Sequence, residues 1–122
     1  MQRPPNLPAD IADEAILLDR GWGTFEDAWT RASVRTIVEF LRNTDVVILG
    51  GDVMRRDERG IRHTYDSWHY NPNAHDAAVV SVSESHAAAR DYVDSYPDPE
   101  DGTILFVLVF RDPADETPNR AL

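Results

Sequence analysis

The stretch VVILGGDVMRRD, residues 46–57, decides how this chain folds. Residues 45–49 are apolar after Asp45 and rich in β-branched side chains, which predicts a short buried strand. Glycine after a strand permits a positive φ angle or a close approach of two backbones. Gly50, Gly51 and Asp52 therefore predict a glycine bulge or an architectural turn between two pieces of sheet. In either case the Asp52 carboxylate would accept backbone hydrogen bonds or face a partner.

An aspartate at the end of a strand is also where several metal-dependent active sites begin. Such a site needs a second carboxylate, a phosphate-binding loop and usually a cationic clamp. The sequence contains no glycine-rich phosphate loop, no HExxH motif, no G-x-S-x-G elbow and no cysteine. On one strand, His63 and His69 would lie ~20 Å apart, too far to share a metal ion. We therefore predict no enzyme, no catalytic residue, no metal site and no cofactor; a small metal-dependent enzyme is the alternative.

Charge is the most informative bulk property of the sequence. Twelve positive side chains, all of them arginine, face twenty-two Asp and Glu, for a formal net charge of −10. Such a field repels phosphate backbones, so we expect no nucleic-acid partner, whereas it speeds encounter with a basic protein. The longest apolar run, residues 104–110, is far shorter than the ~20 residues of a membrane-spanning helix. Together with the lack of cysteine and of a signal peptide, this predicts a cytoplasmic protein without membrane contact.

Helical spacing of apolar residues predicts three helices. The first spans residues 11–20 behind an Asp10 cap, the second runs from a cap at Thr24 to Asn43, and the third starts at Ser83 and stops at Pro97. Short runs of β-branched and aromatic residues predict strands at residues 61–70 after a hairpin turn, at residues 77–82 and at residues 104–110. The last of these runs is the most apolar and should form the central strand.

These elements predict a small single domain of the α+β class, with a mostly antiparallel sheet and two to three helices. The domain should span residues 10–111. Residues 1–9 hold three of the eight prolines and predict a loose arm, and residues 112–122 predict a flexible tail. The sequence leaves open which strand forms the edge of the sheet, where a second copy could pair.

The segment TYDSWHYN, residues 64–71, places three large aromatic residues and an aspartate in a predicted strand. Strict alternation would put Tyr65 and Trp68 on opposite faces, and Asp66, Trp68 and Tyr70 on the same face. Two aromatic rings beside a carboxylate have the composition of an interface hot spot. The alternative is that a helix covers this face and that both rings belong to the core.

The run ILGGDV (48–53), followed by TYDSWHY (64–70) and then by Ser83, Ala87 and Tyr92-Val93 in a helix, resembles the immunity protein 40 family. The resemblance extends over residues 29–110, with Ser67 standing where the family motif usually has Asn. Members are small α+β proteins predicted to neutralise toxins of bacterial polymorphic toxin systems.

The resemblance implies a non-catalytic inhibitor that binds a cognate toxin domain, which the acidity of this chain suggests is basic. A generic protein-binding regulatory module is the second alternative. Two sets of residues then become candidates. The structural motif would comprise Gly50, Gly51, Asp52, Tyr65 and Trp68, and the partner-binding residues would be Asp52, Asp66, Trp68 and Tyr70.

Overall fold

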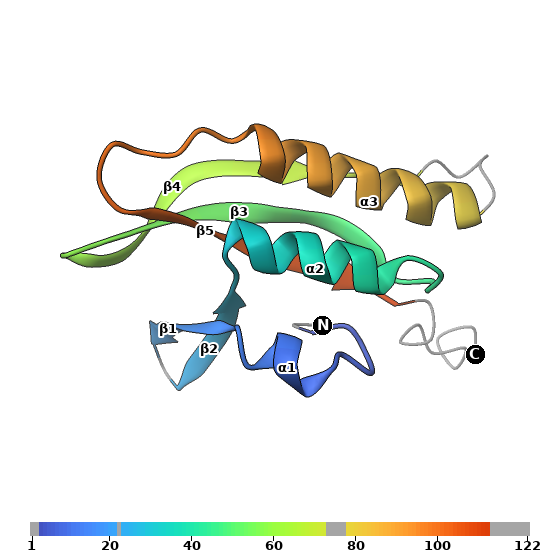
Figure 1. Ribbon diagram of the computed structural model, residues 1–122, viewed down its shortest axis with the longest axis horizontal. Helices are drawn as coiled ribbons and strands as arrows, with labels where there is room; N and C mark the ends of the chain where they lie inside the picture. Colours follow the sequence, from blue (N-terminus) through green and yellow to red (C-terminus); the bar gives the residue numbers. More distant parts are fainter. Residues whose placement is uncertain (1–2, 22, 73–77, 113–122) are drawn as a thin grey trace.

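A three-stranded antiparallel sheet of order β4-β3-β5 is the frame of the fold. It is seen in a computed structural model that describes residues 3–21, 23–72 and 78–112. Two helices lie on one face of this sheet and a small β-hairpin lies against the other, so the domain is α+β as predicted (Figure 1). The elements are α1 (Ala9–Ala12), β1 (Ile16–Gly21), β2 (Thr24–Ala28), α2 (Arg31–Leu41), β3 (Val47–Asp57), β4 (Gly60–His69), α3 (Ala78–Ser95) and β5 (Thr103–Arg111).

The core has two parts because the sheet buries apolar side chains on both faces. On the helical face, Phe106 and Trp68 pack with the buried sides of α2 and α3. On the other face, Leu105 and Val107 pack with Met54 and with the inward side of the β1–β2 hairpin. Alternation along β5 sends successive residues to opposite faces, which is why this strand is buried over residues 104–108.

The glycine pair lies inside β3 and directly follows a bulge at Leu49, so the alternative of a turn at this position is wrong. The pairing of β3 with β5 shifts register between Ile48 and Gly50, and the strand continues to Asp57. Gly50 has a φ of 148°, a conformation that side chains with a Cβ rarely adopt, and a Cβ there would overlap the carbonyl oxygen of Trp68. The chain therefore needs glycine at residue 50.

Gly51 is required for a different reason, which is space. It pairs with Trp68 across the β3–β4 ladder. A Cβ at Gly51 would overlap the carbonyl oxygen of Val107 and would lie 2.5 Å from Cη2 of the Trp68 indole. The tryptophan ring thus lies directly over a backbone that carries no side chain, and the two residues fit only together.

The predicted bounds of the first two helices are wrong, and the reason is long-range packing. Residues 16–20, predicted as the end of the first helix, belong to β1, because Leu18 and Ile16 pack toward the sheet while Leu17 and Asp19 face outward. The second helix begins after Thr30 and not after Thr24, since β2 occupies Thr24–Ala28. The Thr30 hydroxyl accepts a hydrogen bond from the Ser33 amide at 3.1 Å, which caps α2.

Two strand predictions are also corrected. Residues 78–82 of the predicted strand 77–82 are helical, because α3 already starts at Ala78 and not at Ser83. Residue 77 lies outside the described residues. The most apolar strand, β5, lies at one side of the sheet, and the central strand is β3. Besides its pairing with β3, β5 also pairs with Trp29. The backbone amides of Trp29 and Phe106 each donate to the other residue's carbonyl oxygen at 2.8 Å. Among the described strands, β4 forms the other edge of the sheet.

The chain ends are described in part. Arg3, in the predicted arm, donates hydrogen bonds to both carboxylate oxygens of Asp27 at 2.6 and 3.0 Å, and Pro4 is buried. Residues 113–122 of the predicted tail lie outside the described residues. None of the described helices combines the length and the apolar character that crossing a membrane would require.

Arg31, the first residue of α2, joins this helix to the end of α3. Its Nη1 donates to the carbonyl oxygens of Val93 at 2.6 Å and Tyr96 at 2.8 Å, and its Nη2 pairs with Asp98 at 2.8 Å. The guanidinium also lies 5.9 Å from the centroid of the Phe106 ring. One side chain thereby satisfies carbonyl groups that the end of a helix leaves without partners.

Replacing Gly51 with alanine should destabilise the fold by about 3 kcal/mol, because the new methyl group has no room between the Val107 carbonyl and the Trp68 ring. In a Trp68→Leu background the same change should cost less, since one of the two clashes is gone. Gly23→Ala is the control: open space surrounds it, and only its positive φ should matter, at about 1 kcal/mol. Urea unfolding followed by circular dichroism measures all four variants. Equal losses for Gly51→Ala and Gly23→Ala would contradict the packing argument.

Arg31→Ala should lower the free energy of unfolding by about 2 kcal/mol, because two helix-end carbonyls lose a charged donor. Arg31→Lys should restore little, since an ammonium cannot reproduce the planar fork of a guanidinium. Arg35→Ala is the matched control: it removes an exposed pair with Asp94 and should cost less than about 1 kcal/mol. Thermal unfolding at two salt concentrations distinguishes them. A loss that disappears at high salt would indicate a screened surface pair at Arg31.

Candidate functional site

Three of the four tyrosines of the chain lie along the boundary between α3 and the edge strand β4. Tyr70 follows the end of β4, Tyr92 lies on α3, and Tyr96 follows its end. We term this region the tyrosine seam and define it by the six residues of three pairs that cross it: Asp66 with Tyr96, Trp68 with Tyr92, and Tyr70 with Glu84.

Trp68 forms the floor of the seam. Its ring stacks on Tyr92 with centroids 4.6 Å apart and meets Phe106 edge-on at 6.5 Å. Only 8% of the residue is exposed, because α3 covers the Trp68 ring. For Trp68, the alternative of a core residue under a helix is therefore correct. The role of Trp68 as a predicted partner-binding residue stays a prediction, but its contacts are those of a core residue that supports the surface above it.

Asp66 and Tyr70 lie on the same side of β4 as Trp68, as strand alternation predicted. Each is joined to α3 by one hydrogen bond: the Tyr96 hydroxyl donates to Asp66 at 2.5 Å, and the Tyr70 hydroxyl donates to Glu84 at 2.9 Å. Both pairs are exposed to solvent. The seam therefore presents carboxylates held in place by phenol groups on a rigid floor.

Tyr92 and Tyr96 both keep their hydroxyl protons at neutral pH. The hydrogen bond to Asp66 is the main cause that raises the pKa of Tyr96, and burial adds to it. For Tyr92, burial is the main cause of a raised pKa, and the negative charge of Asp66 contributes. At neutral pH both phenols are therefore neutral, and Tyr96 stays a hydrogen-bond donor to the carboxylate.

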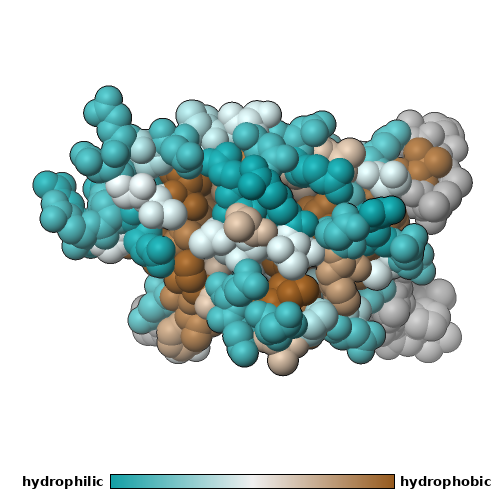
Figure 2. Space-filling model, in the orientation of Figure 1, coloured by the Kyte–Doolittle hydropathy of each residue, from teal (hydrophilic) through white to brown (hydrophobic). Residues whose placement is uncertain are grey.

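A shallow apolar groove of about 470 Å³ adjoins the seam on the α3 side. None of the described residues that line it is cationic: Ala88, Asp91, Tyr92, Ser95, Tyr96 and Pro97. The face of the molecule shown in Figure 2 is mainly hydrophilic, with hydrophobic side chains in narrow strips and small spots. Aromatic rings with polar tips beside carboxylates suit a wet protein–protein contact, and no reactive set is needed for it.

Asp52 does not join the other predicted partner-binding residues. It pairs with Ser67 in the ladder and follows Gly51, so alternation directs its side chain away from Trp68 and α3. Its Oδ1 lies 3.6 Å from Nε2 of His63, a neighbour on β4. The structure thus brings Asp66, Trp68 and Tyr70 together on one face and places Asp52 on the opposite face of the same strands.

The histidines are separated as well. His86 is buried on α3, with Nε2 2.8 Å from the Val46 carbonyl oxygen, and burial lowers its pKa. His75 lies outside the described residues. Within the described ranges, no three His, Asp or Glu side chains converge so that they could hold a metal ion.

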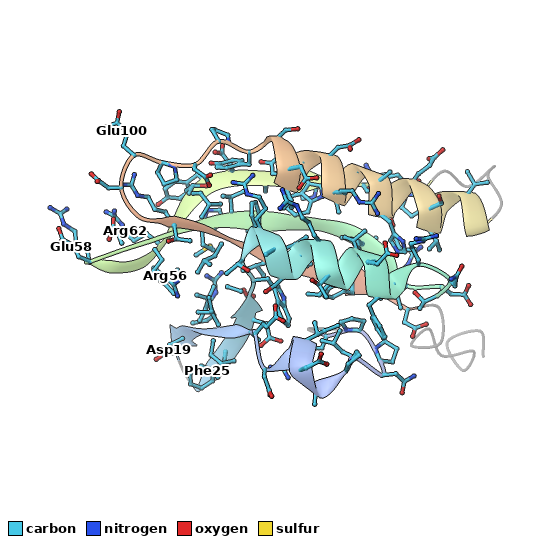
Figure 3. The ribbon with its side chains drawn as sticks, viewed as in Figure 1. Asp19, Phe25, Arg56, Glu58, Arg62 and Glu100 are labelled. Carbon is cyan, nitrogen blue, oxygen red and sulfur yellow. The ribbon has the colours of Figure 1, made fainter. Side chains whose placement is uncertain are left out.

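The tip of the β3–β4 hairpin forms a separate charged cluster at the far end of the sheet (Figure 3). Asp57 is its centre, since it accepts the Arg59 amide at 2.8 Å and pairs with Arg62 at 2.5 Å. The hydrogen bond from the Arg59 amide is the main cause that lowers the pKa of Asp57. In Figure 3, Arg56, Glu58 and Arg62 surround this tip. The negative charge of Asp57 thus offsets part of the positive charge of Arg55 and Arg62 at this tip.

Sequence reasoning found the β4 half of the seam and missed the α3 half. Glu84, Tyr92 and Tyr96 were not proposed as site residues, although Glu84, Ala88, Tyr92 and Tyr96 recur every four residues. That spacing places them on one side of a helix. It could have indicated a second surface, but it could not show which strand the helix would lie beside.

Comparison with known proteins places these features in a family. A family model described as Immunity protein 40 matches residues 18–110, which include the whole three-stranded sheet up to Phe110, both long helices and the tyrosine seam. Neither the curated proteins nor the solved structures contain a significant match. Because the family model spans most of the sequence, the chain belongs to the immunity protein 40 family.

Proposed function

We propose that this chain neutralises a cognate bacterial toxin by binding the toxin's active domain, without catalysing a reaction. The observation that carries the proposal is the family match over residues 18–110, since an immunity protein implies a toxin. The proposed place of action is the cytoplasm, where the cysteine-free sequence would remain unaffected by a reducing environment.

The charge of the chain supports a basic partner. A net charge of −10 raises the rate of encounter with a cationic surface. Added salt screens this attraction and lowers the rate. Toxin domains that attack nucleic acids carry basic sites, so an acidic inhibitor suits them. Within this proposal, Asp66, Tyr70 and Asp52 are contact residues, while Trp68 supports the contact surface from beneath.

The first prediction concerns stoichiometry. Titrating the chain against its cognate toxin domain, identified by co-purification with the chain, should abolish toxin activity linearly, with an endpoint at one chain per toxin domain. The reason is that each chain inactivates one toxin domain and stays bound to it when the complex is tight. Complete loss of toxin activity at a tenth of that ratio would instead indicate that the chain modifies the toxin enzymatically. No inhibition at any ratio would contradict the proposed function.

The second prediction concerns charge. Asp66→Asn keeps an oxygen that can accept the Tyr96 hydroxyl but removes the negative charge of the seam. We expect a slower association rate, a smaller decrease of that rate with added salt, and an unchanged Tm. Glu39→Gln on α2 is the matched control, since it removes another exposed carboxylate that lies outside the seam. Equal association rates for both variants, measured by stopped-flow fluorescence, would place the contact elsewhere on the chain.

A further inference from the structure

The edge strand β4 contains a strained bulge at Tyr65. Pairing with β3 joins Ser67 to Asp52 and His63 to Met54, so residues 64–66 stand opposite the single residue Val53. Tyr65 has a φ of 72°, in the left-handed region that bulky side chains rarely enter. Backbone strain of this kind persists only where the surrounding structure enforces it, and it concentrates at functional sites.

Each residue of the bulge is fixed by a side chain. The Tyr65 amide donates to Nδ1 of His63 at 2.6 Å, and the Asp66 amide donates to the Thr64 hydroxyl at 3.1 Å. The Thr64 hydroxyl in turn donates to the carbonyl of Val53 at 2.9 Å, which replaces a missing ladder bond. Because Nδ1 of His63 is an acceptor, its Nε2 carries the proton and faces Asp52. The bulge is therefore preorganised.

The fold does not explain why the residue in this conformation is a tyrosine. Tyr65 is 90% exposed, and its ring lies beside the His63 ring, with centroids 5.4 Å apart. The seam tyrosines are partly buried, whereas this one projects into solvent. Asparagine or glycine would adopt the same φ with less strain. A large, rigid and exposed ring at a strained position is what an anchor for a partner requires.

The surroundings of Tyr65 define the partner that fits. The bulge interrupts the open edge of β4, so a partner strand cannot extend the sheet there and recognition must use side chains. Asp66 follows Tyr65 directly in the chain. Asp52 lies beside His63, on the face of the strands opposite to Asp66. An arginine or lysine can stack on a phenol ring and pair with either carboxylate.

We propose that Tyr65 is the anchor of this chain and inserts into a pocket of the toxin domain that is lined by arginine or lysine side chains. The inference rests on the proposed function and deepens it, because it names the inserted residue and the chemistry of the surface that receives it. The tyrosine seam then lies beside the anchor and forms the surrounding contact.

Tyr65→Asn separates binding from folding. The dissociation constant for the toxin domain used in the titration should rise about 30-fold or more, as for other anchor residues. The Tm should not fall, because asparagine tolerates a positive φ and the lost ring is almost fully exposed. Tyr65→Phe keeps the ring and should keep most of the affinity. Leu17→Asn is the control: it removes a side chain that is 61% exposed on β1 and should change neither quantity.

Isothermal titration calorimetry and thermal unfolding of the four proteins decide the matter. Unchanged affinity of Tyr65→Asn for a toxin domain that the wild-type chain binds would overturn the anchor and leave the proposed function standing. A clear drop in its Tm would also overturn it, because the ring would then be structural. If the wild-type chain binds no toxin domain, the proposed function and the anchor fail together.

Discussion

The contact between Trp68 and Gly51 is the constraint on which the rest of this structure depends. An indole ring can lie flat over a central strand only where that strand carries no side chain, and Gly51 provides the space. The ring then supports Tyr92, which sets how closely α3 approaches the edge of the sheet. The two motifs of the sequence, ILGGDV and TYDSWHY, are therefore two halves of one packing arrangement.

In this arrangement the aromatic residues have different roles. Trp68 and Phe106 hold the layers together and are closed to solvent. Tyr70 and Tyr96 join β4 to α3 through carboxylates at the surface, so each serves both the fold and the outer face. Among the aromatic residues that the structure describes, Tyr65 is the one that lies almost entirely in solvent. Neighbouring residues of a single strand thus range from purely structural to fully available for contact.

The sequence predicted those parts of the fold in which local pattern and tertiary packing agree. Most of α3 and β4 followed from spacing, and so did the common face of Asp66, Trp68 and Tyr70. β1 was missed because Ile11, Ala15 and Leu18 also satisfy helical spacing; only the distant partners Met54 and Leu105 select the strand. β5 was placed centrally because a strand buried on both faces has the same composition at either position. The positive φ of Tyr65 depends on side-chain hydrogen bonds that no local pattern reveals.

The strained bulge has an evolutionary consequence. Most surface residues that serve recognition also contribute something to stability, so changing them carries a risk to the fold. At residue 65 the two requirements oppose each other, because glycine or asparagine would relax the backbone and remove almost no packing. Descendants of this chain could exchange one toxin for another through substitutions at this position while Gly51 and Trp68 keep the scaffold constant. Diversification of specificity is thereby uncoupled from the inheritance of the fold.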